Sequence, residues 1–301
     1  MKKTMAMLLA MLLLCCAGAL AEGSDNWLDG ILGAVTSGFE EGMDLDGIAS
    51  AAREKKDNRY MASLFIDGEL LEGDPYYDHA RTLDAIDELA ADGRNAALLL
   101  IFNTPGGGLY ESDELHHALS VYKQKTGRPV YAYMKQECCS GGVYAAMAAD
   151  TIYAARMTIT GSVGVYVQTY SEAGLLEKLG ITQEYITTGD NKVAGYPVLT
   201  EDQRAIEQAM VNEGFEFFKG VIREGRGMTD EQMAPFLDGR ILTALQAKEL
   251  GLIDDVLFFD EAMERIFADL GGEIAVKDIT PETQLGFEDM FTSEILKWIM
   301  P

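Results

Sequence analysis

Short apolar runs alternate along the chain with amphipathic segments of helical length. Residues 60–66, 96–102 and 130–134 are apolar at nearly every position, as a strand covered on both faces of a parallel sheet requires. Between them, segments 83–90 and 109–126 carry apolar residues at helical spacing. This alternation predicts the α/β fold class, with crossover connections between parallel strands.

The second half of the chain continues the pattern with more helix than strand. Thr200 and Gln203 form the capping-box signature of a helix that runs to about residue 225. No repeat or proline-rich linker interrupts the pattern, so one domain is predicted over residues 58–272, between a spacer at 22–57 and a C-terminal tail at 273–301. The remaining predicted elements are helices at 141–149, 172–179, 230–237, 244–250 and 261–270, a strand at 151–155 and an extended segment at 183–186.

The first residues have the pattern of an export signal. Two lysines precede an uncharged run, Thr4–Ala21, which ends in the cleavage-site pattern Ala19-Leu20-Ala21. The run is close to the shortest length that spans a bilayer. Residues 1–21 are therefore predicted to be a signal peptide or a membrane anchor, and the protein is predicted to be extracytoplasmic, secreted or anchored at the membrane.

The amino-acid composition excludes several kinds of binding partner and cofactor. The 301 residues are 48% hydrophobic, enough for a core, and carry a formal net charge of −25. Such an acidic surface repels nucleic acid and anionic headgroups, so no nucleic-acid partner is expected. The four cysteines form two adjacent pairs, which gives no disulfide framework, and Cys138 and Cys139 are expected to be buried packing residues. No metal-ligand spacing or cofactor motif is found, so neither a metal nor a cofactor is predicted.

A polar turn at Ser140 is the strongest candidate for chemistry. Ser140-Gly141-Gly142 joins the apolar run at 130–134 to an alanine-rich segment of helical character. A serine at a strand-to-helix junction directs its hydroxyl into a cleft, where the following backbone amides can stabilise an oxyanion. Many such triplets are ordinary turns, so the interpretation depends on the other residues of the site.

A second glycine turn follows another predicted strand. Residues 103–108, Asn-Thr-Pro-Gly-Gly-Gly, come directly after the apolar run at 96–102. Glycines allow the backbone to approach a ligand closely at the carboxyl ends of parallel strands. The turn has neither the Lys-Ser/Thr ending of a phosphate loop nor the glycine spacing of a dinucleotide site.

The base that would activate Ser140 has two candidate types. The three histidines, His79, His116 and His117, all precede Ser140, and the last two are expected on the surface of a helix. A lysine can serve instead, provided that its amine is kept neutral. Lys192 has few charged neighbours in its loop, and a hydroxyl such as that of Ser162 could orient it. From the neighbours alone, an exposed loop lysine fits the pattern better than a base does.

Several motifs together resemble the signal peptide peptidase A family, the S49 peptidases. The resemblance covers roughly residues 60–258 and departs from the family pattern before Lys192, where Gly-Asp-Asn-Lys replaces Gly-Lys-Tyr-Lys. Thr104 and Cys139 replace the family's usual serine and alanine. The motifs that carry the resemblance are Asn103 to Gly108, Cys139 to Tyr144, Thr158 to Val165, Glu224 to Met228, Asp238 to Arg240 and Gln246 to Asp254.

The resemblance implies a ClpP/crotonase-like fold of stacked β-α units and a serine endopeptidase with a Ser/Lys dyad. Ser140 matches the nucleophile, Lys192 the general base and Ser162 the serine that holds the lysine, while Gly107 and Gly141 are expected to form the oxyanion hole. The implied substrates are remnant signal peptides or other exported polypeptides. By analogy the protein would form a homo-oligomeric ring, with possible membrane association through its N-terminal segment.

Two other functions remain open at this point. An exported ring of the same fold could bind peptides without hydrolysing them, and a crotonase-type enzyme would act on an acyl-CoA. The acidic charge disfavours the second, because a CoA site needs basic residues near the phosphates.

Overall fold

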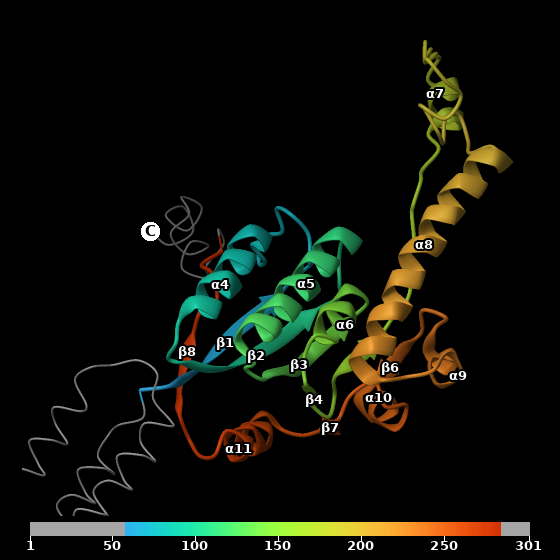
Figure 1. The fold of residues 1–301 in the computed structure, drawn as a ribbon. Helices are drawn as coiled ribbons and strands as arrows, with labels where there is room; N and C mark the ends of the chain where they lie inside the picture. The colour runs from blue at the N-terminus through green and yellow to red at the C-terminus, as the bar shows by residue number, and fades with distance from the viewer. Residues whose placement is uncertain (1–57, 284–301) are drawn as a thin grey trace, which may run out of the picture. The chain divides into compact units, whose positions relative to one another are not determined.

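A computed structural model describes residues 58–283 (Figure 1). The predictions for residues 1–21 and 22–57, and most of the predicted tail, lie outside the described residues. The strands are β1 (Tyr60–Asp67), β2 (Asn95–Thr104), β3 (Val130–Cys139), β4 (Thr151–Ala154), β5 (Ile159–Gly161), β6 (Ile241–Thr243), β7 (Asp255–Val256) and β8 (Ala275–Asp278). The helices are α4 (His79–Ala91), α5 (Leu109–Thr126), α6 (Gly141–Ala146), α7 (Ala173–Lys178), α8 (Glu201–Arg226), α9 (Asp230–Met233), α10 (Ala244–Glu249) and α11 (Phe259–Asp269), with a 3-10 turn, η1, at Ala234–Phe236.

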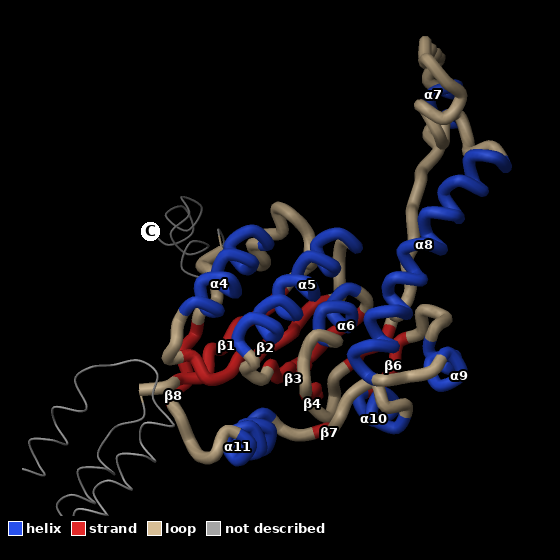
Figure 2. The backbone as a smooth tube through the Cα atoms, in the orientation of Figure 1, coloured by secondary structure: helices blue, strands red, loops and turns tan. Residues whose placement is uncertain are grey.

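The described strands form one sheet in the order β6-β5-β3-β2-β1-β8. Outside this order, β4 pairs with β3, and β7 pairs with β4. All pairings are parallel except that of β5 with β6. Helices α4, α5 and α6 cover one face, and α11 lies against the other (Figure 2). The predicted α/β class and its alternation of parallel strands with helices are confirmed.

The continuous apolar pattern of the central strands reflects burial on both faces. In β2, Leu98, Leu100 and Phe102 pack into the core beneath α4, α5 and α6. The alternate residues Leu99 and Ile101 join a second core that includes residues of α11. Successive strand side chains point to opposite faces, so an apolar residue is needed at every position.

The elements differ from the sequence pattern mainly at short or exposed segments. Strand β8 pairs with β1, so the sheet continues past residue 272, where the pattern placed the end of the domain. Strand β6 was not predicted either. The helix expected over 230–237 is instead α9 followed by a 3-10 turn, because Pro235 has no N–H to continue an α-helix.

Helix α8 carries part of the chain away from the sheet. It begins with the predicted capping box, in which the Thr200 and Gln203 side chains bond each other's backbone N–H groups, and it ends at Gly227 in the left-handed region. Figure 1 shows its N-terminal half, with α7, standing clear of the sheet. We call residues 167–210 the arm. The segment at 183–186 has no strand partner within the arm.

Candidate active site

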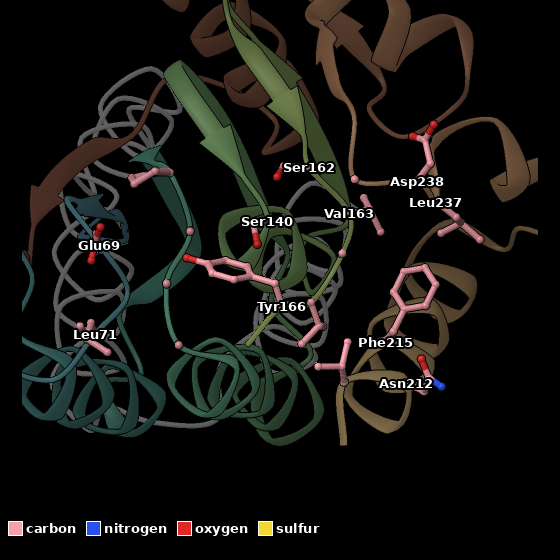
Figure 3. Close-up of a pocket in the computed structure, with 18 residues that line it drawn as sticks. Glu69, Leu71, Ser140, Ser162, Val163, Tyr166, Asn212, Phe215, Leu237 and Asp238 are labelled. Carbon is pink, nitrogen blue, oxygen red and sulfur yellow. The ribbon is translucent and has the colours of Figure 1, made fainter. Parts of the chain in front are cut away.

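A cavity of about 730 Å³ opens at the carboxyl ends of β2, β3 and β5. Figure 3 shows Ser140 in its centre, with Glu69 and Leu71 on one side and Phe215 and Leu237 on the other. This is the edge of a parallel α/β sheet where ligands bind.

Ser140 occupies a strained turn between β3 and α6. Its φ angle is 49° and its ψ angle −118°, a conformation that L-residues other than glycine rarely adopt. Its N–H donates to the Gly161 carbonyl at 2.9 Å, and its carbonyl accepts from the Tyr144 N–H at 3.0 Å. These bonds fix the turn while the half-buried side chain faces the cavity.

Ser162 lies beside Ser140 because of the β3–β5 register. Cys139 is paired with Gly161, so the next residue of each strand is a serine at the cavity. The Ser162 N–H donates to the Arg240 carbonyl at 2.8 Å. Within residues 58–283, Ser140 and Ser162 are the two non-glycine residues with positive φ, at 49° and 52°. Strain of this kind concentrates at functional sites.

The glycine turn after β2 packs directly on the backbone around Ser140. A Cβ on Gly106 would lie 2.8 Å from the Gly141 nitrogen and 2.8 Å from the Ser140 Cβ. One on Gly107 would lie 2.2 Å from the Leu70 oxygen. No other residue type fits at these two positions, so the Gly106–Gly107 peptide is held between Leu70 and the Ser140 turn.

Two amide groups in this region lack an acceptor. In the described part of the chain, the Gly107 N–H makes no backbone hydrogen bond, whereas its neighbour Gly108 donates to Leu70 O at 2.8 Å. Gly141 is the first residue of α6, and such an N–H has no partner inside its own helix. The Thr104 hydroxyl accepts from the Gly106 N–H at 3.1 Å and so fixes the turn that carries Gly107.

Lys192 lies on the exposed arm and does not line the cavity. Its N–H donates to the Gly189 carbonyl at 3.1 Å in a turn, and the Gln203 side chain ties the same loop to the start of α8 through Asp190 O at 2.9 Å. Helix α8 reaches the cavity only at Val211, about 12 Å further along its axis. Within one chain, the structure brings together Ser140, Ser162, Gly107 and Gly141, but not Lys192.

The thiols beside Ser140 are poor nucleophiles. Burial raises the pKa of Cys139 to about 12, and burial raises the pKa of Cys138 well above its ordinary value. Both are buried, as the sequence analysis expected. A thiol must ionise to react, so these cysteines are packing residues.

The histidines are outside the cavity as well. His79 is buried and bonds Tyr77 at 2.9 Å and Glu114 at 3.0 Å. His117 is exposed, as predicted, but His116 is half-buried against the Tyr144 ring, which corrects the prediction for that residue. Burial lowers the pKa of His116.

The apolar wall of the cavity was not predicted from the sequence. It consists of Val165 and Tyr166 from the segment after β5, Phe215 from α8 and Leu237 from the loop before β6. Val165 is the last residue of the S49-like motif at 158–165 and Tyr166 directly follows it, which is the one signal that could have identified them. Phe215 and Leu237 reach the site only through the tertiary fold.

Neither a metal site nor a membrane span is found in the described residues. No group of three His, Cys, Asp or Glu side chains gathers there in a way that could hold a metal ion. Between residues 58 and 283, none of the helices combines the length and apolarity needed to cross a bilayer.

Comparison with known proteins connects this site to a family. The model of "Peptidase family S49" matches residues 122–271. The "Putative signal peptide peptidase SppA" of Enterococcus faecium is 30% identical over 225 residues, which are 74% of this chain and 63% of that protein. The "Putative protease slr0021" of Synechocystis is 36% identical over 160 residues, 52% of this chain and 57% of that protein. The chain thus spans about three fifths of the length of these relatives.

Among solved structures, the chain is similar to the "1510-N membrane-bound stomatin-specific protease S97A mutant". The TM-score is 0.46 and the identity 15%, covering 74% of this chain and 99% of that one.

Proposed function

Because this chain belongs to peptidase family S49, we propose that it is a serine endopeptidase that hydrolyses peptide bonds through a Ser/Lys dyad. The observation that carries the proposal is the strained Ser140, held in a cavity beside the acceptor-free amides of Gly107 and Gly141. A nucleophile and two main-chain donors in this arrangement suit acyl transfer.

The reaction divides into two acyl-transfer steps. Ser140 Oγ attacks the peptide carbonyl and passes its proton to the neutral amine of Lys192, which returns it to the leaving amine. Water then attacks the acyl-enzyme with the same base and releases the acid, regenerating Ser140. In both steps the Gly107 and Gly141 N–H groups stabilise the oxyanion, and the Ser162 hydroxyl orients the lysine.

Lys192 reaches Ser140 in this proposal from a neighbouring copy of the chain. Within one chain the arm holds Lys192 away from the cavity, and the arm itself exposes many apolar side chains, up to 97% for Ile186. Large exposed apolar patches mark protein contacts. A homo-oligomer in which the arm packs on the next protomer would bury these side chains and bring the amine into a less hydrated site, which favours its neutral form.

The cavity supports a peptide substrate. Val165, Phe215 and Leu237 offer an apolar wall to a side chain next to the cleaved bond. Remnant signal peptides, which are apolar, and other exported polypeptides fit such a wall. We assign the protein an extracytoplasmic location, secreted or held at the membrane by residues 1–21, in keeping with the export pattern of those residues.

Labelling with a fluorophosphonate probe, together with turnover of an unfolded polypeptide, tests the proposal. The wild-type protein should be labelled and should cleave the substrate, and Ser140→Ala should lose both without losing its fold. Ser120→Ala, at a serine on α5 that does not line the cavity, is the matched control and should behave as wild type. Persistent labelling of Ser140→Ala would show that the nucleophile is another residue.

The position of Lys192 also favours a second candidate function. Without a base in the cavity, the same groove would bind peptides and not cleave them, as a non-catalytic ring. This candidate predicts a folded oligomer that binds peptides with no turnover. An acyl-CoA enzyme is disfavoured, because the cavity lining includes Glu69 and Asp238 and, among the described residues, no basic side chain for the phosphates.

A further inference from the structure

We infer that Ser112 is a positioning residue that sets the spacing between the two oxyanion donors, an inference that rests on the proposed function. Ser112 lies in the first turn and a half of α5 and is 0% exposed. Its hydroxyl donates to the Gly108 carbonyl at 2.7 Å, and its N–H donates to the same oxygen at 3.1 Å. The side chain is thereby fixed to the turn that carries Gly107.

The same hydroxyl lies against the start of α6. A Cβ on Gly141 would lie 2.2 Å from Ser112 Oγ, 3.2 Å from the Gly107 nitrogen and 3.3 Å from Ser112 Cβ. One small side chain therefore touches the Gly107–Gly108 turn and Gly141 at once. Gly141 has no space on this side for any atom beyond its Cα.

The sheet does not fix this spacing on its own. The two donors follow different strands, Gly107 after β2 and Gly141 after β3. The β2–β3 pairing is regular up to Phe102 and Met134 and then shifts register before Thr104 pairs with Cys138. Because the ladder is irregular at the strand ends, contacts outside the sheet must hold the two turns together, and the packing of Gly106 on the Ser140 turn is one of them. Ser112 is in contact with both.

A serine that bonds the carbonyl four residues earlier is common in helices and by itself affects only local stability. The contact with Gly141 gives Ser112 a second role, the positioning of the two donors, which can be distinguished from local stabilisation of the helix. If Ser112 positions the donors, its loss weakens binding of the transition state, whereas ground-state binding of the peptide is unchanged. The expected signature is a fall in kcat without a rise in KM.

The experiment is a double-mutant cycle in the full-length protein, with kcat, KM and melting temperature measured on the same peptide. Ser112→Ala should lower kcat by about tenfold, less than the ~10²–10³-fold seen when an oxyanion donor is removed outright. Gly141→Ala should lower kcat by about a hundredfold, because its new Cβ displaces Ser112 Oγ and the Gly107 turn. KM should stay within about twofold in both.

The double variant provides the sharp test. In Ser112→Ala/Gly141→Ala the 2.2 Å contact is gone and the nearest remaining neighbours are at 3.2–3.3 Å, which small shifts accommodate. Its kcat should therefore exceed that of Gly141→Ala by about fivefold or more, a non-additive effect expected only for residues in contact. Ser120→Ala on the same helix is the control and should leave kcat unchanged.

The outcomes distinguish failure of the proposed peptidase function from failure of the positioning role of Ser112. If the wild-type protein neither cleaves peptide nor is labelled at Ser140, the proposed function fails before Ser112 is tested. If the wild type is active and Ser112→Ala keeps its full kcat, or the double variant is no better than Gly141→Ala, the positioning role is wrong. Should Ser112→Ala not fold, Ser112→Cys, which retains a side chain of similar shape but a weaker donor, must show the same selective loss of kcat.

Discussion

Mixing two inactive variants tests whether each active site is shared between two copies of the chain. Ser140→Ala lacks the nucleophile and Lys192→Ala the base, so each alone should be inactive. The Gln203 bond to Asp190 O, at 2.9 Å, fixes the Lys192 loop near the start of α8, and Val211, where α8 meets the cavity, lies about 12 Å along the axis. A lysine side chain is a four-carbon stem, shorter than this separation, so it does not cross to Ser140 within one chain.

Hybrid oligomers should therefore recover activity. In a random equal mixture, a site is complete when its serine comes from the Lys192→Ala copy and its lysine from the Ser140→Ala copy. That is about a quarter of sites in a closed ring with one lysine donor per site. The two variants are co-expressed with different tags and purified through both tags in sequence, and peptide turnover is compared with that of wild type.

The same measurement can refute the reasoning. If hybrids that contain both variants remain inactive while wild type is active, the lysine does not act across the interface. If Lys192→Ala alone retains turnover, the base is another residue. Wild-type protein carrying both tags controls for an effect of the tags on assembly.

Three further predictions concern stability and reactivity. Phe218 is 1% exposed and packs its ring on Tyr144. Phe218→Ala should therefore lower the free energy of unfolding, measured by urea titration, by about 3–5 kcal/mol. The control Phe217→Ala, at a side chain that is 60% exposed, should change it by less than about 0.5 kcal/mol. Hydrogen bonding from Lys248 and Arg265 lowers the pKa of Asp255 to about 2 from 3.8, so its contribution to stability is complete above about pH 4 and is lost as the pH falls through about 2. Asp255→Asn should thus cost about 1 kcal/mol at pH 7 and little at pH 2, and an equal cost at both values would contradict the assignment. Iodoacetamide should label Cys138 and Cys139 only after unfolding, because burial raises the pKa of both thiols. Mass spectrometry identifies the labelled residues. Rapid labelling of either thiol in the folded protein would refute this prediction.

The central elements could be predicted because their patterns have local causes. Strand β2 is apolar throughout because it has a core on each side, and α8 begins at a capping box formed by residues three apart. The turn at Ser140 was found for the same reason, since it lies between a buried strand and a short apolar helix. The capping box and the turn are each contained in a few consecutive residues. In the apolar strand, the apolar side chain at each position indicates that this position is buried.

Other elements could not be predicted because their stability comes from distant partners. Strands β6 and β8 are short edge strands with weak apolar patterns, and they exist through pairing with β5 and β1. The cavity wall at Phe215 and Leu237 follows from the way α8 and the loop after it return to the sheet. The sequence also gave no indication that Ser112 touches Gly141, because the contact joins two helices that follow different strands.

The amino-acid sequence alone determined the fold class, the family resemblance, the nucleophile candidate and its glycine neighbours, since these depend on residue type and short-range order. Only the tertiary structure decided that Ser162 stands next to Ser140 and that the arm holds Lys192 outside the cavity of its own chain. The physical reason is that strand register and helix direction set which distant residues meet, and a motif of a few residues carries no information on either.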